Sequence, residues 1–278
     1  MSDNTNPLSK SFRQPTVQLK LPSDGKYWKD GDVQIPVTGE LPIYPMRVSD
    51  EITLKTPDAL INGGAVVELI HNCVPSIKNA WNAPITDIDA ILIAIRIASY
   101  GIEMDVTIDC PSCTSENDFA IDLRTVLQRI KTANFSSPVV FDGLKISFKP
   151  QSYLESNADD MVQFEQDRLV KALMDIELPN EEKSRIMKES VKKITLLAVQ
   201  NIATHIECIT TQEGVKVTDK SHIIEFLMNC SRATYKGMQE KIKSLNDASI
   251  LKPLHVQCTH CQHEFESGLV FNYSRFFG

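Results

Sequence analysis

The chain has 278 residues and a formal net charge of −7, from 29 Lys and Arg against 36 Asp and Glu. This acidic balance argues against a general nucleic-acid binder, because affinity for polyphosphate comes mainly from Lys and Arg. The hydrophobic fraction of 42% is enough to build a core, so we expect one large or two small folded domains and not a disordered chain.

Membrane and secretion signals are absent from the sequence. The richest apolar run, Ala90 to Ala98, contains Arg96 and falls well short of the roughly 18 residues that a membrane span needs. The segment from Met1 to Lys20 is polar and lacks the apolar core of a secretory signal. We therefore expect a soluble protein in a reducing compartment, where its seven cysteines are thiols or metal ligands.

The first quarter of the chain mixes irregular and helical patterns. Residues 1–26 are polar and predict either an extended arm that becomes ordered on a partner or a disordered tail. Glycine and proline punctuate residues 27–52, which favours short strands and turns. Thr56-Pro57-Asp58 is typical of a helix start, and the apolar periodicity predicts a helix up to Cys73. Gly63-Gly64 either lets a partner backbone approach this helix or is a plain kink.

A second helix is predicted from Thr86, with Asp89 completing its N-terminal cap and apolar residues on most sides, as in a buried helix. Residues 103–123 predict strand, turn and strand. Asp142-Gly143 favours a tight hairpin turn within residues 139–148.

The second half of the chain is mainly helical in pattern. Helices are predicted over about 155–176 and 181–208, with two more within 219–247. A short hairpin around Gly214 lies between the second and third, and the tail from Leu254 returns to strand.

Two cysteine pairs form the strongest motif, Cys110-Pro111-Ser112-Cys113 and Cys258-Thr259-His260-Cys261. A C-x-x-C knuckle points two thiolates at one ion, and two knuckles complete the tetrahedral sulfur site that zinc prefers. Phe119 and Phe265 stand where the returning strands begin. This layout predicts a zinc ribbon with one structural Zn²⁺ per chain, held by Cys110, Cys113, Cys258 and Cys261.

The gap between the pairs is 144 residues (258 − 113 − 1), where a compact ribbon has roughly 15 to 20. We therefore predict an α+β protein with one domain inserted into another. Residues 27–123 and 253–278 would form a platform domain with N-terminal helices and the split ribbon, and residues 124–252 a mainly helical insertion. A zinc affinity of roughly 10 kcal/mol or more could hold the ends of so long a loop, because closure entropy grows slowly with length.

Other interpretations of the cysteines stay open, namely a thiol-redox pair or unrelated thiols. A redox pair needs a thioredoxin-like β-α-β context, whereas both pairs here lie between predicted strands. His255, His260 and His263 could replace a cysteine ligand or lie beside the site. Three further cysteines, Cys73, Cys208 and Cys230, fall on apolar helical segments, which indicates core thiols.

Catalysis is not indicated. Four thiolates leave no open position on a zinc ion. The sequence also lacks the G-x-G-x-x-G, G-x-x-x-x-G-K-[ST], G-x-S-x-G and H-E-x-x-H motifs. We therefore expect a protein that is not an enzyme.

The C-terminus is rich in aromatic residues, with Phe271, Tyr273, Phe276 and Phe277 among its last eight positions. A chain can bury such residues against its own core. They can equally anchor it to a neighbouring subunit, because aromatic side chains are enriched at interfaces and their hot spots.

The segment 41–52, LPIYPMRVSDEI, and its continuation 54–63, LKTPDALING, resemble the baseplate protein family of T4-like contractile-tailed bacteriophages. Tyr27-Trp28 and the paired knuckles are similar to that family too. The similarity covers about residues 20–123 and the second knuckle, and the long helical insertion departs from it. The resemblance implies a component or assembly factor of the baseplate hub at the end of the phage tail.

From this resemblance we expect partners among other baseplate hub or tail proteins, or further copies of the chain. The protein would work in the host cytoplasm during assembly and in the virion tail baseplate. The candidate interface residues are Tyr44, Met46, Arg47, Asp50, Asp58, Asn62, Phe271, Tyr273, Phe276 and Phe277. The alternative is a nucleic-acid-binding zinc-ribbon regulatory protein, against which the zero net charge of residues 252–278 argues.

Overall fold

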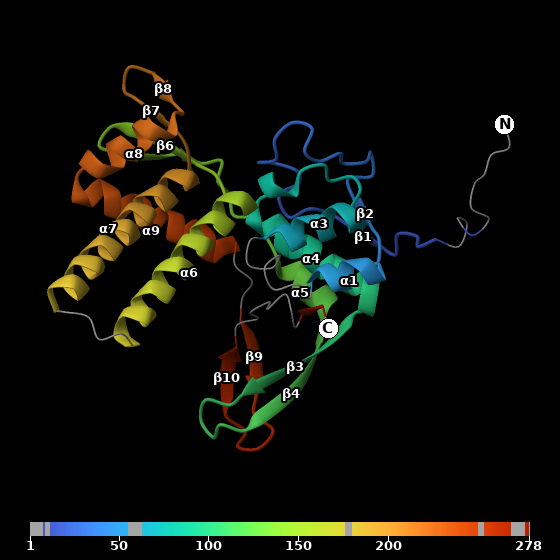
Figure 1. Cartoon of the computed structure of the whole chain (residues 1–278). Coiled ribbons are helices and arrows are strands. Elements are labelled where there is room, and N and C mark those ends of the chain that lie inside the picture. The colour runs from blue at the N-terminus through green and yellow to red at the C-terminus, as the bar shows by residue number, and fades with distance from the viewer. Residues whose placement is uncertain are drawn as a thin grey trace. The chain divides into compact units, whose positions relative to one another are not determined.

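The computed structural model describes residues 8, 12–54, 63–175, 180–249, 253–267 and 276–277 (Figure 1). The chain divides into two compact units. Unit 1 comprises Met1–Ala80, Thr86–Lys131 and Leu251–Gly278, and unit 2 comprises Trp81–Ile85 and Thr132–Ile250. Both units combine helices with small sheets, so the predicted α+β class is confirmed.

Unit 1 is built from helices and antiparallel strand pairs. Its helices are α1 (Val48–Leu54), α3 (Gly64–Cys73), α4 (Ile85–Tyr100) and α5 (Leu123–Arg129). Its strand pairs are β1 (Val17–Leu19) with β2 (Leu41–Ile43), β3 (Glu103–Asp109) with β4 (Glu116–Asp122), and β9 (Leu254–Gln257) with β10 (Glu264–Ser267).

The core of unit 1 surrounds α4, the helix predicted to be buried. Ile88, Ile91 and Ile95 of this helix have no exposed surface. The helix begins at Ile85, so Thr86 lies inside its first turn and does not cap it as predicted. Asp87 is buried and accepts hydrogen bonds from the Ser23 backbone N–H, at 2.9 Å, and from the Trp28 indole, at 2.7 Å.

The hydrogen bonds to Asp87 show that part of the predicted N-terminal arm packs on α4. Burial raises the pKa of Asp87, while the hydrogen bonds from Ser23 and Trp28 oppose that shift. Further upstream, β1 pairs with β2, and Leu19 and Leu21 are buried. Residues 17–23 therefore pack within unit 1, and an extended arm reaching to residue 26 is wrong for this part. Alternating apolar residues in a polar segment were too weak a signal to predict it.

α1 was missed in the sequence, where prolines pointed to turns and strands. Its first turn is stabilised by Asp50, whose carboxylate accepts from the Arg47 backbone N–H at 2.7 Å, as in a capping box. The predicted start of the next helix at Thr56 lies outside the described residues. Its predicted end at Cys73 is confirmed, and Gly63, with φ of 72°, is the left-handed residue before its first described turn.

Unit 2 combines a four-stranded antiparallel sheet with long helices. The sheet order is β5-β6-β7-β8, with β5 at Val139–Phe141, β6 at Leu144–Phe148, β7 at Ile206–Thr210 and β8 at Lys216–Val217. The helices are α6 (Tyr153–Asp175), α7 (Asn180–His205), α8 (Lys220–Asn229) and α9 (Arg232–Ser249). The short 3₁₀ helix η2 (Ala80–Asn82) lies where the chain first passes from unit 1 to unit 2. Across the described ranges, the helices lack the combination of length and apolar character that a bilayer span requires.

Local turn chemistry was predicted well in unit 2. Asp142 and Gly143 have φ of 47° and 78°, the pair of positive angles that the Asp-Gly hairpin prediction requires. The predicted end of α7 at residue 208 is three residues late, because Ile206 onward pairs with β6. The Lys220 ammonium donates to the carbonyls of Ala203 and Ile206, each at 2.6 Å, and so caps the end of α7.

Candidate metal centre

Two hairpins of unit 1, β3–β4 and β9–β10, lie side by side (Figure 1). Their turns bring the four predicted zinc cysteines together. Cys110 and Cys113 lie in the turn between β3 and β4, and Cys258 and Cys261 lie between β9 and β10. The Sγ atom of Cys110 is 3.7 Å from that of Cys261, and the Sγ atom of Cys113 is 3.6 Å from that of Cys258. All four sulfurs lie within 4.8 Å of one another.

These sulfur separations fit a tetrahedral metal site. Four sulfurs at about 2.3 Å from a zinc ion are about 3.8 Å apart along each edge of the tetrahedron. A disulfide needs about 2.0 Å between its sulfurs, and the short separations here join different knuckles. The cluster is therefore compatible with a zinc site that all four thiolates would fill, leaving no coordination position for a substrate.

The two knuckles have the same backbone conformation. Thr114 N–H donates to the Cys110 carbonyl at 2.8 Å, and Gln262 N–H donates to the Cys258 carbonyl at 3.0 Å. Thr114 and Gln262 each follow the second cysteine of their pair, and their φ angles are 56° and 60°. This left-handed residue reverses the chain after each pair and directs both sulfurs of a knuckle to one side.

Backbone N–H groups favour the thiolate form of Cys258. The N–H of Cys261 and that of His260 approach its sulfur at 3.5 and 3.4 Å and lower the pKa of Cys258 to about 5. The Ser115 hydroxyl and backbone N–H lower the pKa of Cys113. The His263 N–H lowers the pKa of Cys261, but the neighbouring thiols and burial together outweigh it, so this pKa is raised. A cation bound among the sulfurs would favour the thiolate form of all four cysteines, so that they would no longer share protons.

Asn117, which sequence reasoning missed, ties the two knuckles together. Its side chain is buried, and its Oδ1 accepts from the backbone N–H and the hydroxyl of Thr259, each at 2.8 Å. Its Nδ2 donates to the Ser115 carbonyl at 2.8 Å. One amide therefore holds both knuckles in register across 142 residues of sequence. The one available signal was a polar residue just after a knuckle. Exposed strand residues are polar too, so the sequence could not distinguish Asn117 from them.

The histidines near the second knuckle lie outside the sulfur cluster. His255 pairs with Glu266 at 3.4 Å, and His263 stacks on Phe265. The His260 ring lies 3.3 Å from the Thr259 hydroxyl. Among the described residues, the group that could hold a metal here consists of the four cysteines without a histidine.

Comparison with known families decides where the chain belongs. A family model described as T4 bacteriophage base plate protein matches residues 14–278. The chain belongs to this base plate family. The match includes the helical insertion, which the sequence resemblance did not cover. Neither the curated proteins nor the solved structures contain a match to the chain.

The interface residues predicted for this base plate protein fall into several environments. Asp50 is buried, and its carboxylate accepts from the Arg47 guanidinium and, at 2.9 Å, from the Asn72 amide. It therefore joins α1 to α3 within unit 1. Tyr44 and Met46 donate their backbone N–H groups within the same unit, Tyr44 to the Cys73 carbonyl and Met46 to the Ser99 hydroxyl. The predicted residues Asp58, Asn62, Phe271 and Tyr273 lie outside the described residues.

Phe276 and Phe277 pack into unit 1. Both are buried, and their rings meet edge to face with centroids 5.0 Å apart. The Phe276 carbonyl accepts from Arg96 Nε at 2.8 Å, and the Phe277 carbonyl accepts from the Tyr100 hydroxyl at 3.0 Å. Both residues therefore pack against the chain's own core, and a contact of this terminus with a neighbouring subunit stays a prediction.

Proposed function

We propose that this base plate protein is a non-enzymatic component or assembly factor of the phage tail baseplate hub, stabilised by one structural Zn²⁺. Membership of the base plate family supports a place in the phage tail. The observation that carries the metal proposal is the convergence of four sulfurs, from pairs 144 residues apart, within 4.8 Å. Its partners would be other hub or tail proteins, met in the host cytoplasm during assembly.

In this proposal the two hairpins are the halves of a split zinc ribbon. The ion would be held by Cys110, Cys113, Cys258 and Cys261, and it would supply a cross-link and no chemistry, because its coordination is complete. The platform would be unit 1, which adds residues 17–23 and α5 to the predicted ranges 27–123 and 253–278. The insertion would then be residues 132–250, shorter than the predicted 124–252. The cross-link would fix both ends of the insertion to the platform.

Charge argues against the alternative of a nucleic-acid-binding zinc ribbon. Residues 103–122 and 254–267 contain no Lys or Arg. Their acidic residues are Glu103, Asp105, Asp109, Glu116, Asp118, Asp122, Glu264 and Glu266. Four thiolates around a divalent ion would add further negative charge. Phosphate backbones bind through Lys and Arg, so this surface would repel them.

The baseplate part of the proposal is tested by quantitative mass spectrometry of purified phage tails and of infected-cell lysates. A fixed small copy number relative to a known hub protein would identify a structural component. Abundance in the lysate and in hub assembly intermediates, without presence in finished tails, would identify an assembly factor. Absence from both tails and assembly intermediates would refute a baseplate role.

The metal part is tested on the purified full chain by elemental analysis. We expect one zinc per chain, lost in Cys110→Ala together with a fall in melting temperature. Cys230→Ala is the matched control, because Cys230 is a partly buried thiol in unit 2 outside the sulfur cluster. A Cys110→Ala chain that retains zinc and its melting temperature would exclude the four-cysteine site.

A further inference from the structure

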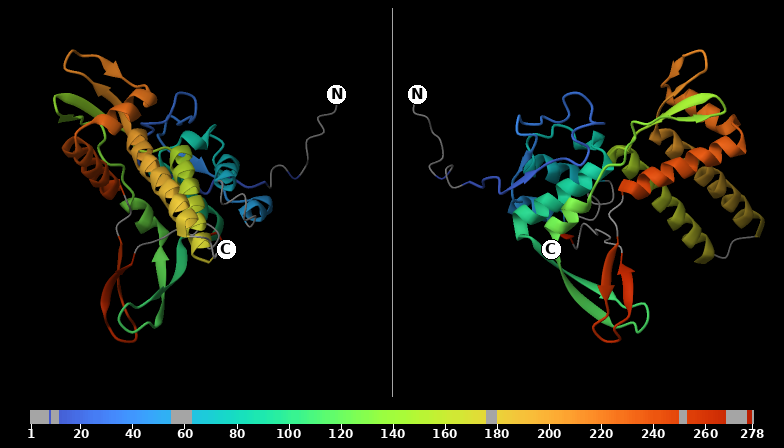
Figure 2. Two further views of the ribbon diagram at one scale, coloured as in Figure 1. Left: turned by 60° about the vertical axis from the view of Figure 1, so that its left-hand side comes forward. Right: turned by 180° about the vertical axis from the view of Figure 1, so that it is seen from behind.

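Unit 2 contains a groove of about 680 Å³ between α6, α7 and α9. Its apolar wall comes mainly from α7, with Ile194, Leu197 and Ala198, and from Ile242 of α9. Seen from behind in Figure 2, α9 crosses one end of the α6–α7 hairpin, and the hairpin extends beyond it. Ile194, which lines the groove, is also one of the exposed apolar residues of α7.

An apolar row on α7 continues from the groove toward the N-terminal half of the helix. Met187, Val191 and Ile194 are spaced four and three residues apart, which places them on one face of the helix. Their exposed fractions are 46%, 61% and 37%. With Ala198 in the groove, the row spans twelve residues, or about 16 Å at the helical rise over eleven steps. Rows at this spacing are the surfaces that two helices bury when they pack against each other.

The buried side of the same hairpin is partly polar. Gln166 of α6 and Ser190 of α7 are buried, although within the described part of the chain neither Gln166 Oε1 nor Ser190 Oγ has a hydrogen-bond partner. The hairpin thus encloses polar groups while it exposes Met187 and Val191. Such an arrangement leaves the apolar row available for an external contact.

The wall and rim opposite the apolar row carry mostly acidic groups. Asp159 and Asp160 of α6 and Asp247 of α9 line the groove, with Lys243 as its basic residue. Among the described residues, Asp160, Asp247 and Lys243 form no ion pair. Burial, followed by the Asp159 charge, raises the pKa of Asp160, as expected for a carboxylate that lacks a cationic partner.

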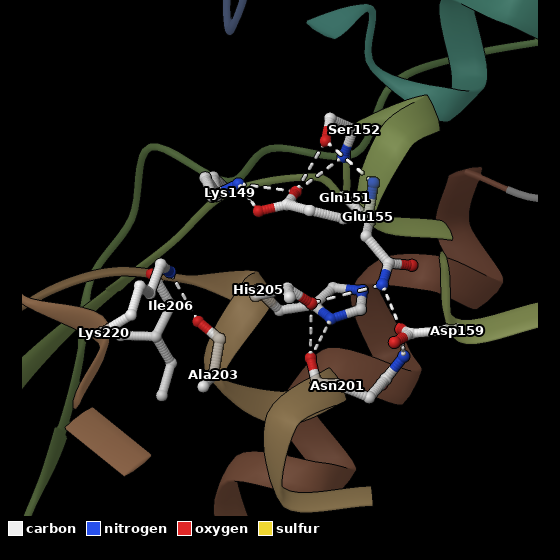
Figure 3. Close-up of polar contacts among 11 residues, drawn as sticks. Lys149, Gln151, Ser152, Glu155, Asp159, Asn201, Ala203, His205, Ile206 and Lys220 are labelled. Atoms are coloured by element: carbon white, nitrogen blue, oxygen red, sulfur yellow. Dashed lines mark hydrogen bonds and ion pairs between the residues drawn. The ribbon is translucent and has the colours of Figure 1, made fainter. Parts of the chain in front are cut away.

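A network of hydrogen bonds fixes the end of the groove near the sheet (Figure 3). Asp159 Oδ2 accepts from the Gln151 amide at 2.6 Å and from the Asn201 amide at 2.7 Å. Gln151 also donates to the Thr204 hydroxyl at 3.2 Å. Ser152 and Glu155 form a capping box at the start of α6. These contacts hold α6 and α7 in place, so a ligand would meet a largely formed surface.

We propose that this groove binds an amphipathic helix of another protein, with apolar side chains toward α7 and Lys or Arg toward Asp160 and Asp247. Charge complementarity favours such a partner over a second copy of the chain, because the chain carries −7 and two copies would bring like charges together. The partner would be a tail protein if the proposed function holds. The groove belongs to unit 2 and the four-cysteine cluster to unit 1, so each proposal can fail alone.

The test uses the purified full chain and a fluorescent 15-residue helix-forming peptide with one leucine face and one lysine face. Fluorescence anisotropy at low salt compares it with a scrambled peptide of the same composition and with a version carrying Glu for Lys. We expect binding of the amphipathic basic peptide and at least tenfold weaker binding of the other two. Equal binding of the scrambled peptide would indicate nonspecific charge attraction and overturn the proposal.

Matched variants locate the binding site. Val191→Ser should weaken the peptide about tenfold by removing a buried apolar contact. Asp160→Asn should weaken it about threefold and reduce its salt dependence. Leu196→Ser and Glu189→Gln lie on other faces of α7 and should leave binding unchanged. Equal effects of Val191→Ser and Leu196→Ser, or a dimer in sedimentation that Val191→Ser dissociates, would overturn the proposal.

Discussion

Replacing Asn117 by alanine removes the amide that joins the two cysteine knuckles. The change deletes three hydrogen bonds of 2.8 Å, two from Thr259 and one to Ser115. At about 0.5–1.5 kcal/mol each, their loss should lower the free energy of unfolding by roughly 2–4 kcal/mol. Thr259 itself is exposed, so water can replace Asn117 at its N–H, and the loss should fall toward the lower end of this range. The zinc ligands themselves stay intact, so the variant tests alignment of the knuckles separately from their chemistry.

The assay is zinc competition against a chromophoric chelator, together with urea unfolding of the zinc-loaded chain. We expect the Kd for zinc to rise about 10- to 100-fold, as for other residues that orient metal ligands. Glu116→Ala is the control, because Glu116 is an exposed neighbour of Asn117 on the same strand and should change stability by less than about 0.5 kcal/mol. If Asn117→Ala binds zinc and unfolds as the wild type does, the knuckles align without this amide and our reasoning is wrong.

Three further substitutions test other parts of the structure. Cys258→Ser should abolish stoichiometric zinc binding, measured by elemental analysis, whereas Cys230→Ser should retain it. Burial raises the pKa of Asp89 to about 7, so its charge opposes folding increasingly as the pH rises from about 4 to 7. Asp89→Asn should therefore raise the unfolding free energy in urea by about 1–4 kcal/mol at pH 8 and leave it unchanged near pH 4; a pH-independent difference would contradict this. Gly143→Ala places a side chain at φ of 78° against Gln212. Calorimetry should show that the free energy of unfolding falls by about 1 kcal/mol.

Local patterns predicted the elements whose preferences act over a few residues. The buried helix at Ile88–Ala98 followed from apolar spacing, and the β5–β6 hairpin followed from Asp142-Gly143. The helices α1 and α5 were missed because both are only seven residues long. In α5 the cap is Asp122, whose side chain accepts from the Arg124 N–H, a signal hidden at the end of a predicted strand.

Contacts between distant residues could not be read from the sequence. The environment of Asp50 is an example, because the amide of Asn72 and the packing of α1 on α3 enclose it, and the sequence around Asp50 contains neither contact. The groove of unit 2 needs three helices, and the sequence shows each of them only as an amphipathic segment. Which face of a helix meets another depends on crossing geometry, which single-helix periodicity does not contain.

The sequence by itself determined the donor set of the candidate metal centre, because the C-x-x-C spacing constrains two sulfurs through a turn of only a few bonds. It also indicated the baseplate family through a short segment near the N-terminus. The tertiary structure alone decided that the two pairs meet across 144 residues, that Asn117 aligns them, and that α6, α7 and α9 leave an acidic groove open. Steric and hydrogen-bond preferences are set by sequence neighbours, whereas burial and charge environment are set by residues that only folding brings close.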